Sequence, residues 1–391
     1  MPTVAVVGGS LGGLTAGLVL RDAGCDVTVY ERSLADLEAR GAGIAMLAQT
    51  LRYPVQRQGV PAERFCSTTG WIRFLERDGT VSFEQPHRYW FSSWNAVYRT
   101  LLGGFDRARY RLGCEMVSFK DVAGGVTVCF ADGSDIGADL LVCADGVNST
   151  ARAIVSPDVA PRYSGYVAWR GVVPEGELSA RTRAALHDAL TYQLLPNSHI
   201  LVYPIPGHDG TVTEGRRLMN MVWYRNLAED DLPDLLTDRP GRRRSVSLPP
   251  GAARHEVVAD MRAVAAAELA PAIAEVVGAI PEPFVQAVVD IEVPHMVWGR
   301  TCLIGDAAFA VRPHAAAGTA KAAEDAWVLA QALVEAGGDV DIALRRWEDR
   351  QLSLGRALLA RTRDIGDSSQ FTGTFRPGDP RLIFGLYCPG R

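Results

Sequence analysis

The chain has 391 residues, a formal net charge of -5, 48% hydrophobic residues and 22% charged residues. This composition is typical of a globular protein with a large apolar core and excludes a predominantly disordered chain. Nucleic-acid binding is not expected either, because it depends on clustered Lys and Arg, and the one dense basic run, at 242–244, is short. The length favours two closely packed domains.

The start of the chain and the cysteines indicate the compartment. The first 24 residues lack the basic start of a signal peptide, and glycines interrupt their apolar stretch before it reaches membrane-spanning length. The seven cysteines are scattered without any C-x-x-C spacing, which indicates reduced thiols and neither a zinc site nor a disulfide framework. We therefore expect a cytoplasmic protein without a membrane segment or a bound metal. Lys120 and Lys321 are the only lysines, a bias typical of GC-rich bacterial genomes.

The chain opens with the pattern of a strand, a turn, a helix and a second strand. Residues 3–7 are a β-branched apolar run, residues 14–23 have apolar periodicity, and residues 25–32 are again typical of a strand. Such a βαβ unit requires a parallel sheet. Two similar fragments lie at 139–146 and 300–308, the second followed by an alanine-rich helix over 320–335. We expect the three fragments to form one sheet from discontinuous segments.

The middle of the chain has a different pattern. The segments 163–174, 190–206 and 217–225 are rich in β-branched and aromatic residues and are punctuated by Pro and Gly, which favours a largely antiparallel sheet. Helices are expected at 255–278 and 340–366, and an irregular strap from Ser368. The predicted fold class is mixed α/β and α+β. Its domains are a βαβ domain (1–70, 100–155 and 285–335), an inserted antiparallel substrate domain (71–99 and 156–284), and a C-terminal helix and strap (336–391).

A glycine-rich turn follows the first strand and fits G-x-G-x-x-G with a serine in the middle position. The first glycine permits a tight turn, the last permits close helix packing, and the helix N-terminus attracts a pyrophosphate. An acidic residue stands 23 residues after the first glycine, near the spacing at which it accepts a hydrogen bond from a ribose hydroxyl. The turn therefore predicts a dinucleotide site. Its candidate cofactor-binding residues are Gly8, Ser10, Leu11, Gly13, Glu31 and Arg32.

Two further motifs identify the dinucleotide. The segment 144–152 (ADGVNSTAR) and the segment 305–308 (GDAA), with Pro313 and Gly318 downstream, resemble the second and third signatures of the group A flavin-dependent aromatic hydroxylases. The resemblance implies the fold of para-hydroxybenzoate hydroxylase, with an FAD-binding Rossmann-like domain. It also implies that Asp306 holds the flavin ribitol and that Asp145 and Gly146 lie where pyrophosphate and nicotinamide approach.

The resemblance extends to further cofactor contacts, and it has departures. The start of the alanine-rich helix, Gly318, Thr319 and Ala320, is expected to line the pyrimidine edge of the flavin through its N–H groups, and Gly43 to contact the cofactor. Phe309 stands where the family commonly has a histidine, and Ala320 where it often has an asparagine. Trp94 stands where many members have a phosphate-binding arginine, with Arg99 one turn later as a candidate substitute.

The resemblance implies an enzyme that uses FAD, O2 and NADH or NADPH. Such a monooxygenase hydroxylates a small electron-rich hydroxylated aromatic ring through a flavin C4a-hydroperoxide. The segments GYVAWRG (165–171), YPIPG (203–207) and RPHAAAG (312–318) favour a pyridine or pyridone substrate. Two alternatives stay open: a phenol hydroxylase in natural-product tailoring, and a flavin-binding homologue that has lost activity. A homo-oligomer is compatible with each of them.

Residues for the ring chemistry are expected on the antiparallel sheet and beside the flavin. A histidine or tyrosine is needed to relay the proton of the substrate hydroxyl. Candidates for the chemical step are His314, Pro313, Tyr203 and His199. Candidates for binding the ring are Tyr192, Trp223 and Phe309.

Overall fold

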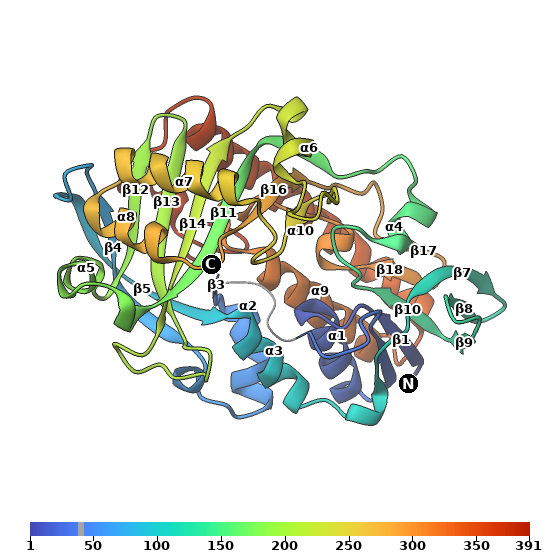
Figure 1. The fold of residues 1–391 in the computed structure, drawn as a ribbon. Helices are drawn as coiled ribbons and strands as arrows, with labels where there is room; N and C mark the ends of the chain where they lie inside the picture. Colours follow the sequence, from blue (N-terminus) through green and yellow to red (C-terminus); the bar gives the residue numbers. More distant parts are fainter. Residues whose placement is uncertain (38–42) are drawn as a thin grey trace.

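The computed structural model describes residues 1–37 and 43–391. In this part of the chain, two large sheets lie side by side, and a small three-stranded sheet extends from one end (Figure 1). The six-stranded sheet has the order β17-β18-β10-β1-β2-β6 and the nine-stranded sheet the order β15-β16-β11-β14-β13-β12-β4-β5-β3. The mixed α/β fold class predicted from the sequence is confirmed.

The six-stranded sheet is built on the opening βαβ unit. Its strands are β1 (Thr3–Val7), β2 (Asp26–Tyr30), β6 (Tyr110–Arg111), β10 (Leu140–Cys143), β17 (Val297–Trp298) and β18 (Thr301–Leu303). β1 pairs in parallel with β2 on one side and with β10 on the other, and β10 pairs in parallel with β18. The three fragments predicted at 3–32, 139–146 and 300–308 therefore share one sheet.

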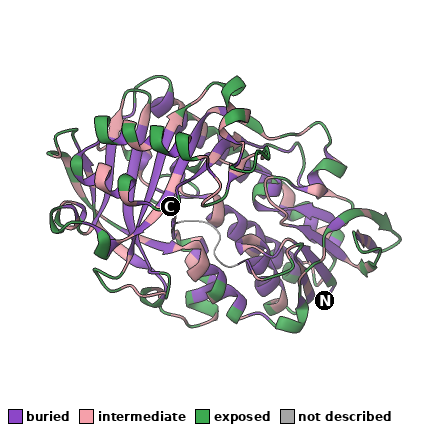
Figure 2. Ribbon diagram, in the orientation of Figure 1, coloured by how far each residue is buried: buried purple, intermediate pink, exposed green. Residues whose placement is uncertain are grey.

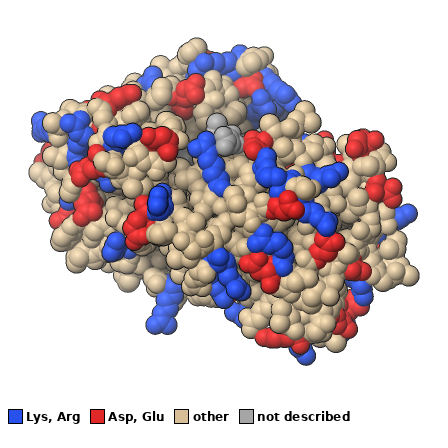
Figure 3. All heavy atoms as spheres, turned by 90° about the horizontal axis from the view of Figure 1, so that it is seen from below, with Lys and Arg blue, Asp and Glu red and all other residues tan. Residues whose placement is uncertain are grey.

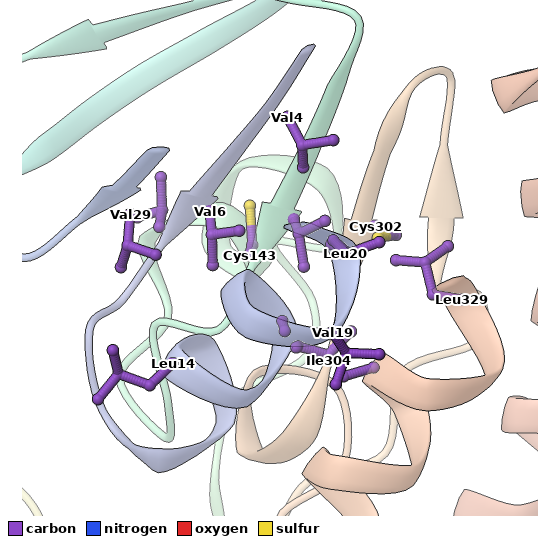
Figure 4. Packing of buried hydrophobic residues seen from close by; sticks show 14 of the residues in the cluster. Val4, Val6, Leu14, Val19, Leu20, Val29, Cys143, Cys302, Ile304 and Leu329 are labelled. Atoms are coloured by element: carbon purple, nitrogen blue, oxygen red, sulfur yellow. The ribbon is translucent and has the colours of Figure 1, made fainter. Parts of the chain in front are cut away.

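Helices cover this sheet because its strands are apolar on both faces, as parallel strands usually are. α1 (Leu11–Asp22), α9 (Gly318–Glu335) and α10 (Val340–Gln370) pack against one another, and α3 (Trp94–Gly103) packs on α1. Figure 4 shows the core where side chains of the strands meet α1 and α9, including Val6, Leu14 and Leu329. The three-stranded sheet at the edge contains β7 (Met116–Val122), β8 (Gly125–Phe130) and β9 (Asp135–Ala138), and α4 (Thr150–Val155) packs on it.

The nine-stranded sheet is mostly antiparallel, with one parallel pair between β4 and β12. Its strands are β3 (Gly43–Ala45), β4 (Ser67–Leu75), β5 (Val81–Ser93), β11 (Arg162–Pro174), β12 (Ala189–Leu195), β13 (Ser198–Ile205), β14 (Leu218–Asn226), β15 (Ser247–Leu248) and β16 (Phe284–Asp290). α7 (His255–Glu268) and α8 (Pro271–Ala279) cover one face, with α5 (Ala180–Leu186) and α6 (Leu232–Leu235) beside them. The remaining helix, α2 (Ala48–Arg52), packs on α9. Figure 2 shows the strands as the buried layer, with exposed residues on the outer sides of the helices.

Three details differ from the sequence predictions. The helix expected at 255–278 is two helices, because Pro271 has no N–H to continue α7 and instead begins α8. The last helix continues to Gln370, so the strap begins at Phe371. The expected domain limits at residues 70 and 284 fall within β4 and β16, and β3 pairs with the nine-stranded sheet.

The surface and the helices are ordinary for a globular protein. Acidic and basic side chains lie beside one another over the face seen in Figure 3, without a broad region of one sign. Within residues 1–37 and 43–391, none of the helices combines the length and the apolar character that crossing a membrane requires.

Candidate active site

In the turn between β1 and α1, glycine backbone atoms without side chains lie at the edge of a cavity. Gly8 has a φ of +102°, and a Cβ atom there would lie 2.4 Å from the carbonyl oxygen of Ala144. A Cβ atom on Gly13 would lie 1.7 Å from the carbonyl oxygen of Gly8. Both positions therefore require glycine. α1 begins at Leu11 without a side-chain cap, so its first N–H groups are available to an anionic ligand.

Glu31 lies at a cavity of about 290 Å³ beyond this turn. Its buried carboxylate accepts hydrogen bonds from the N–H groups of Gly9 (2.8 Å) and Ser33 (2.9 Å). Arg32, Asp145 and Gly146 line the same cavity. The acid predicted at the end of β2 is thus held in position by the glycine turn itself.

Asp145 uses its carboxylate within the protein. It accepts hydrogen bonds from Ser149 Oγ (2.6 Å) and from the N–H of Ala151 (3.1 Å), at the start of α4. Arg152 then ties this helix to the third motif, because its Nη1 donates to the carbonyl oxygen of Ala307 (3.0 Å). The second and third sequence motifs are therefore joined directly.

A second, larger cavity of about 470 Å³ adjoins the first. Ser10, Trp94, Ala144 and Gly146 line both, so the two form one elongated space. The larger cavity extends from the ends of β1 and β18 to the face of the nine-stranded sheet opposite α7 and α8. An elongated space that begins at an acid after β2 and follows a glycine turn fits a dinucleotide.

Asp306 faces the larger cavity. It is the one exposed residue in the stretch 301–310, and its carboxylate has no hydrogen-bond partner among the described residues. A carboxylate that faces a cavity and has no partner in the protein is suited to accept hydrogen bonds from the hydroxyl groups of a ligand. The side chain is therefore placed as the ribitol-binding prediction requires.

The start of α9 also reaches the larger cavity. Gly318 and Thr319 line it, and the first N–H groups of a helix have no partner within the helix. Their positive dipole end favours negative charge in the cavity. The side chain of Ala320 is fully buried with Leu354 and Leu358 and does not line the cavity, so the contact through its N–H stays a prediction.

Alternate residues of four neighbouring strands form the opposite wall. Because side chains alternate across a strand, one face of each strand lines the cavity while the other packs under α7 and α8. Gly43 of β3 completes the wall through its N–H, which donates to Asn220 Oδ1 (2.8 Å). The lining residues of the four strands are Ala168, Arg170, Tyr192, His199, Leu201, Tyr203, Val222 and Tyr224.

Three tyrosines contribute hydroxyl groups to this largely apolar wall. Tyr192, Tyr203 and Tyr224 are each 4% exposed, and their hydroxyl groups have no partner among the described residues. Burial raises the pKa of Tyr203 to about 12, and burial also raises the pKa of Tyr192 and of Tyr224. All three hydroxyls are therefore protonated donors at neutral pH.

His314 and His199 lie together at one end of the cavity, with ring centres 5.4 Å apart. His314 Nε2 and the hydroxyl of Tyr166 are 2.7 Å apart, and His314 Nδ1 is buried without a partner in the described chain. His199 Nδ1 pairs with Ser369 Oγ, beside the C-terminal strap. Burial lowers the pKa of His199 to about 3 and that of His314 well below its ordinary value, so both rings are neutral. Pro313, also predicted, lines the cavity next to His314.

Three other predicted residues lie elsewhere. Trp223 is on the opposite face of β14, where it packs in the core under α7 and α8. Phe309 is buried below the cavity, with its ring against Gly355 and 5.1 Å from Lys321 Nζ. Arg99 is exposed and lines neither cavity, whereas Trp94, one turn earlier, lines both. Each correction concerns the direction of a side chain, which spacing along the sequence does not reveal.

Sequence reasoning missed Arg170 and Tyr224. Both lie on the cavity face of their strands: Tyr224 pairs with the predicted residue His199, and Arg170 pairs with Val222, which in turn pairs with Leu201. The alternation of side chains along β14 could have identified Tyr224. If His199 faces the ligand, the residue paired with it on β14 faces the ligand too, and that residue is Tyr224, not Trp223.

The fold and the site define a flavoprotein whose nucleotide space opens into an aromatic pocket. A family model described as "FAD binding domain-like" matches residues 163–290. The chain is 37% identical to the 2,6-dihydroxypyridine 3-monooxygenase of Paenarthrobacter nicotinovorans, over 98% of this chain and 95% of that protein. It is 29% identical to a 3-amino-4-hydroxybenzoate 2-monooxygenase of Streptomyces platensis, over 93% and 88%. The crystal structure of 2,6-dihydroxypyridine-3-hydroxylase from Arthrobacter nicotinovorans superposes with a TM-score of 0.93 and 35% identity, over 100% and 98% of the two chains.

The chain therefore belongs to the group A FAD-dependent aromatic hydroxylases. It is an FAD-dependent monooxygenase that hydroxylates a small aromatic ring, with NADH or NADPH as the reductant of the family. The predictions of family, cofactor and reaction class are confirmed.

Proposed function

We propose that this enzyme hydroxylates a hydroxylated pyridine or pyridone. The observation that carries the proposal is the similarity to the dihydroxypyridine hydroxylase, which covers 98% of this chain in sequence and 100% in structure. The cavity supports it, because aromatic side chains and three tyrosine hydroxyls suit a flat ring with oxygen substituents. A phenol substrate is the second candidate, supported by the relative that acts on 3-amino-4-hydroxybenzoate.

The residues that would hold FAD follow the elongated space. Glu31 and Arg32 would bind its adenosine end, the turn from Gly8 to Gly13 its pyrophosphate, and Asp306 its ribitol. When bound and reduced by NADH or NADPH, FAD supplies the electrons and the activation of O2 that no side chain provides. Gly318 and Thr319 would donate N–H groups to the flavin ring from the start of α9.

The chain's own contribution to the reaction is to bind the ring and exclude water. We assign Tyr203 and Tyr224 as hydrogen-bond donors to ring oxygens, because their hydroxyls stay protonated. His314 is assigned as a neutral side chain of the cavity wall that positions the ring, since its strongly lowered pKa makes it a weak proton acceptor. This assignment retains His314 at the site while changing the role expected from the sequence.

The domain division and the cellular location expected from the sequence are part of this proposal. The antiparallel sheet forms most of the substrate domain, and the six-stranded sheet most of the FAD domain. A cytoplasmic location is supported by the seven cysteines, all of which are free thiols.

A substrate panel tests the function. Purified holoenzyme is mixed with NADH or NADPH and with hydroxypyridines or phenols, and both reductant consumption and product mass are measured. We expect a hydroxypyridine to accelerate consumption and to gain one oxygen atom. Faster turnover of a phenol would favour the second candidate. If the protein is fully loaded with FAD and hydroxylates none of the compounds, it is an inactive homologue.

A further inference from the structure

Arg170 is the one cationic residue among the described residues that line the larger cavity. It lies on β11, half-buried, and its side chain is directed away from α7 and α8, like the neighbouring Ala168. Two neutral acceptors hold the guanidinium: Gln286 Oε1 at 3.0 Å from Nη1 and the carbonyl oxygen of Gly43 at 2.9 Å from Nη2. These contacts fix the plane of the group at the wall of the cavity.

The charge of Arg170 is not neutralised by the described part of the chain. No carboxylate of those residues lies within ion-pair distance, whereas the half-buried Arg217 and the buried Arg312 pair with Glu175 and Asp290 at 2.7 and 3.1 Å. Its Nε is buried and has no hydrogen-bond partner in the described residues. A guanidinium at the wall of a cavity without a carboxylate partner is costly unless an anion in the cavity balances its charge.

The surroundings of Arg170 indicate where that anion belongs. The facing residues are Tyr224 and Tyr203 on β14 and β13, with Gln286 on β16 and Gly43 on β3. Arg170 and the two tyrosines line the same cavity, where burial raises the pKa of both tyrosines and the positive charge of Arg170 opposes that rise. The acidic residue of the cavity, Asp306, belongs to the six-stranded sheet and to the ribitol site.

We propose that Arg170 determines the charge specificity of the cavity by binding an anionic oxygen of the aromatic substrate, with Gln286 positioning the guanidinium. The anionic oxygen is carried either directly on the ring or on a carboxylate substituent. The inference rests on the proposed function in that the cavity binds the ring to be hydroxylated, and it narrows the substrate class to aromatic anions.

The test measures binding to the oxidised holoenzyme by perturbation of the flavin absorbance. Two ligand pairs compare an anion with a neutral compound built on the same ring: benzoate with benzamide, and 2,6-dihydroxypyridine with 2-hydroxy-6-methoxypyridine, at a pH where only the dihydroxypyridine is ionised. The variants are Arg170→Gln, which removes the positive charge, and Arg170→Lys, which keeps the charge but lacks the planar guanidinium group with its several N–H donors. The control is Arg225→Gln on β14, whose side chain lies over Trp223 on the other face of the sheet.

We expect the wild type to prefer the anion of at least one pair. Arg170→Gln should weaken binding of that anion by roughly 10- to 100-fold while changing its neutral partner by less than about threefold. Arg170→Lys should lose less, and Arg225→Gln should match the wild type. The pair that shows the preference identifies the source of the anionic oxygen.

Three results would overturn the proposal: no preference for the anion in either pair, equal losses for charged and neutral ligands in Arg170→Gln, or a changed flavin reduction potential with unchanged ligand affinity. Benzoate and benzamide need not be hydroxylated. The charge preference is therefore measured even if no pyridine is a substrate, and failure of the proposed function is recognised separately from failure of this inference.

Discussion

Buried polar side chains in this enzyme differ in whether the protein itself satisfies them. Arg312 and Asp290 form a buried ion pair at 3.1 Å, and Arg312 also donates to Asp367 Oδ1 at 2.7 Å. Tyr203, Tyr224 and His314 instead keep polar atoms without partners in the described chain, and all three line the cavity. Because an unpaired buried group costs free energy, unsatisfied groups gathered at one cavity indicate where a ligand completes the hydrogen bonding.

The lowered pKa of His199 predicts acid sensitivity. The folded state takes up its proton near pH 3, whereas an unfolded histidine takes it up near pH 6.5, so the unfolded state binds more protons between these values. Stability should therefore fall as the pH drops below 6.5, by about 1.4 kcal/mol per pH unit from this residue. His199→Gln should reduce the loss of Tm between pH 7 and pH 5, measured by thermal unfolding.

Exposed His208 supplies the matched control, since it lies on a loop outside the cavity. His208→Gln should keep the acid sensitivity of the wild type. An identical fall in Tm for the wild type and His199→Gln would contradict the buried, neutral state of His199.

Strand β14 places two adjacent aromatic residues in different environments. Trp223 packs in the core under α7 and α8 and donates from Nε1 to Ser198 Oγ at 3.0 Å, whereas Tyr224 lines the cavity. Trp223→Ala should destabilise the protein by about 3–5 kcal/mol, because it leaves a void in a packed core. Tyr224→Phe should change stability little and raise KM, because it removes only a hydroxyl that faces the ligand. Denaturant unfolding and steady-state kinetics of the two variants check this; a stronger effect of Trp223→Ala on KM than on stability would reverse the assignment.

The turn between β1 and α1 gives a prediction about the cofactor. Gly13→Ala should yield a protein with little bound FAD, because its Cβ would overlap the carbonyl oxygen of Gly8 and displace the pyrophosphate turn. Gly137→Ala on β9 is the control, since nothing lies within 4 Å of its added Cβ. The absorbance of the purified variants near 450 nm reports flavin content on the order of one per chain for the control. Full flavin content in Gly13→Ala would argue against the turn as the pyrophosphate site.

At the scale of the whole molecule, the C-terminal strap closes the cavity. Phe375, Leu382 and Phe384 line it, the N–H of Phe384 donates to the hydroxyl of Tyr89 (3.0 Å), and the N–H of Gly385 donates to the carbonyl oxygen of Ala315. The strap thus joins β5 of one sheet to the segment before α9 of the other. We therefore expect the strap to limit the entry of water to the cavity.

Removing an aromatic side chain of the strap should uncouple NAD(P)H oxidation from hydroxylation of the ring. Phe384→Ala should raise the hydrogen peroxide released per NAD(P)H oxidised by at least about twofold, because water admitted to the site competes with oxygen transfer. Tyr387→Phe is the control, since Tyr387 is 47% exposed and contacts Glu324 outside the cavity. Peroxide release and product yield are measured together, and unchanged coupling in Phe384→Ala would show that the strap does not protect the reaction.

Much of the site was predictable because its motifs are local. The glycine turn, Glu31 and the segment around Asp306 each depend on backbone geometry within a few residues, so their spacing is visible in the sequence. The wall of the cavity was harder to predict, because four strands contribute to it through pairing over long sequence distances, as when Tyr203 pairs with Asn220.

By itself, the sequence determined the βαβ start, the antiparallel middle and the flavin family, since periodicity, glycine spacing and ordered motifs are properties of short segments. Only the tertiary structure decided that the side chains of Tyr224 and Arg170 face the ligand while those of Trp223, Phe309 and Ala320 do not. The physical reason is that alternation along a strand or helix divides residues into two faces, but only packing against neighbouring elements decides which face is buried in the core and which one meets the ligand.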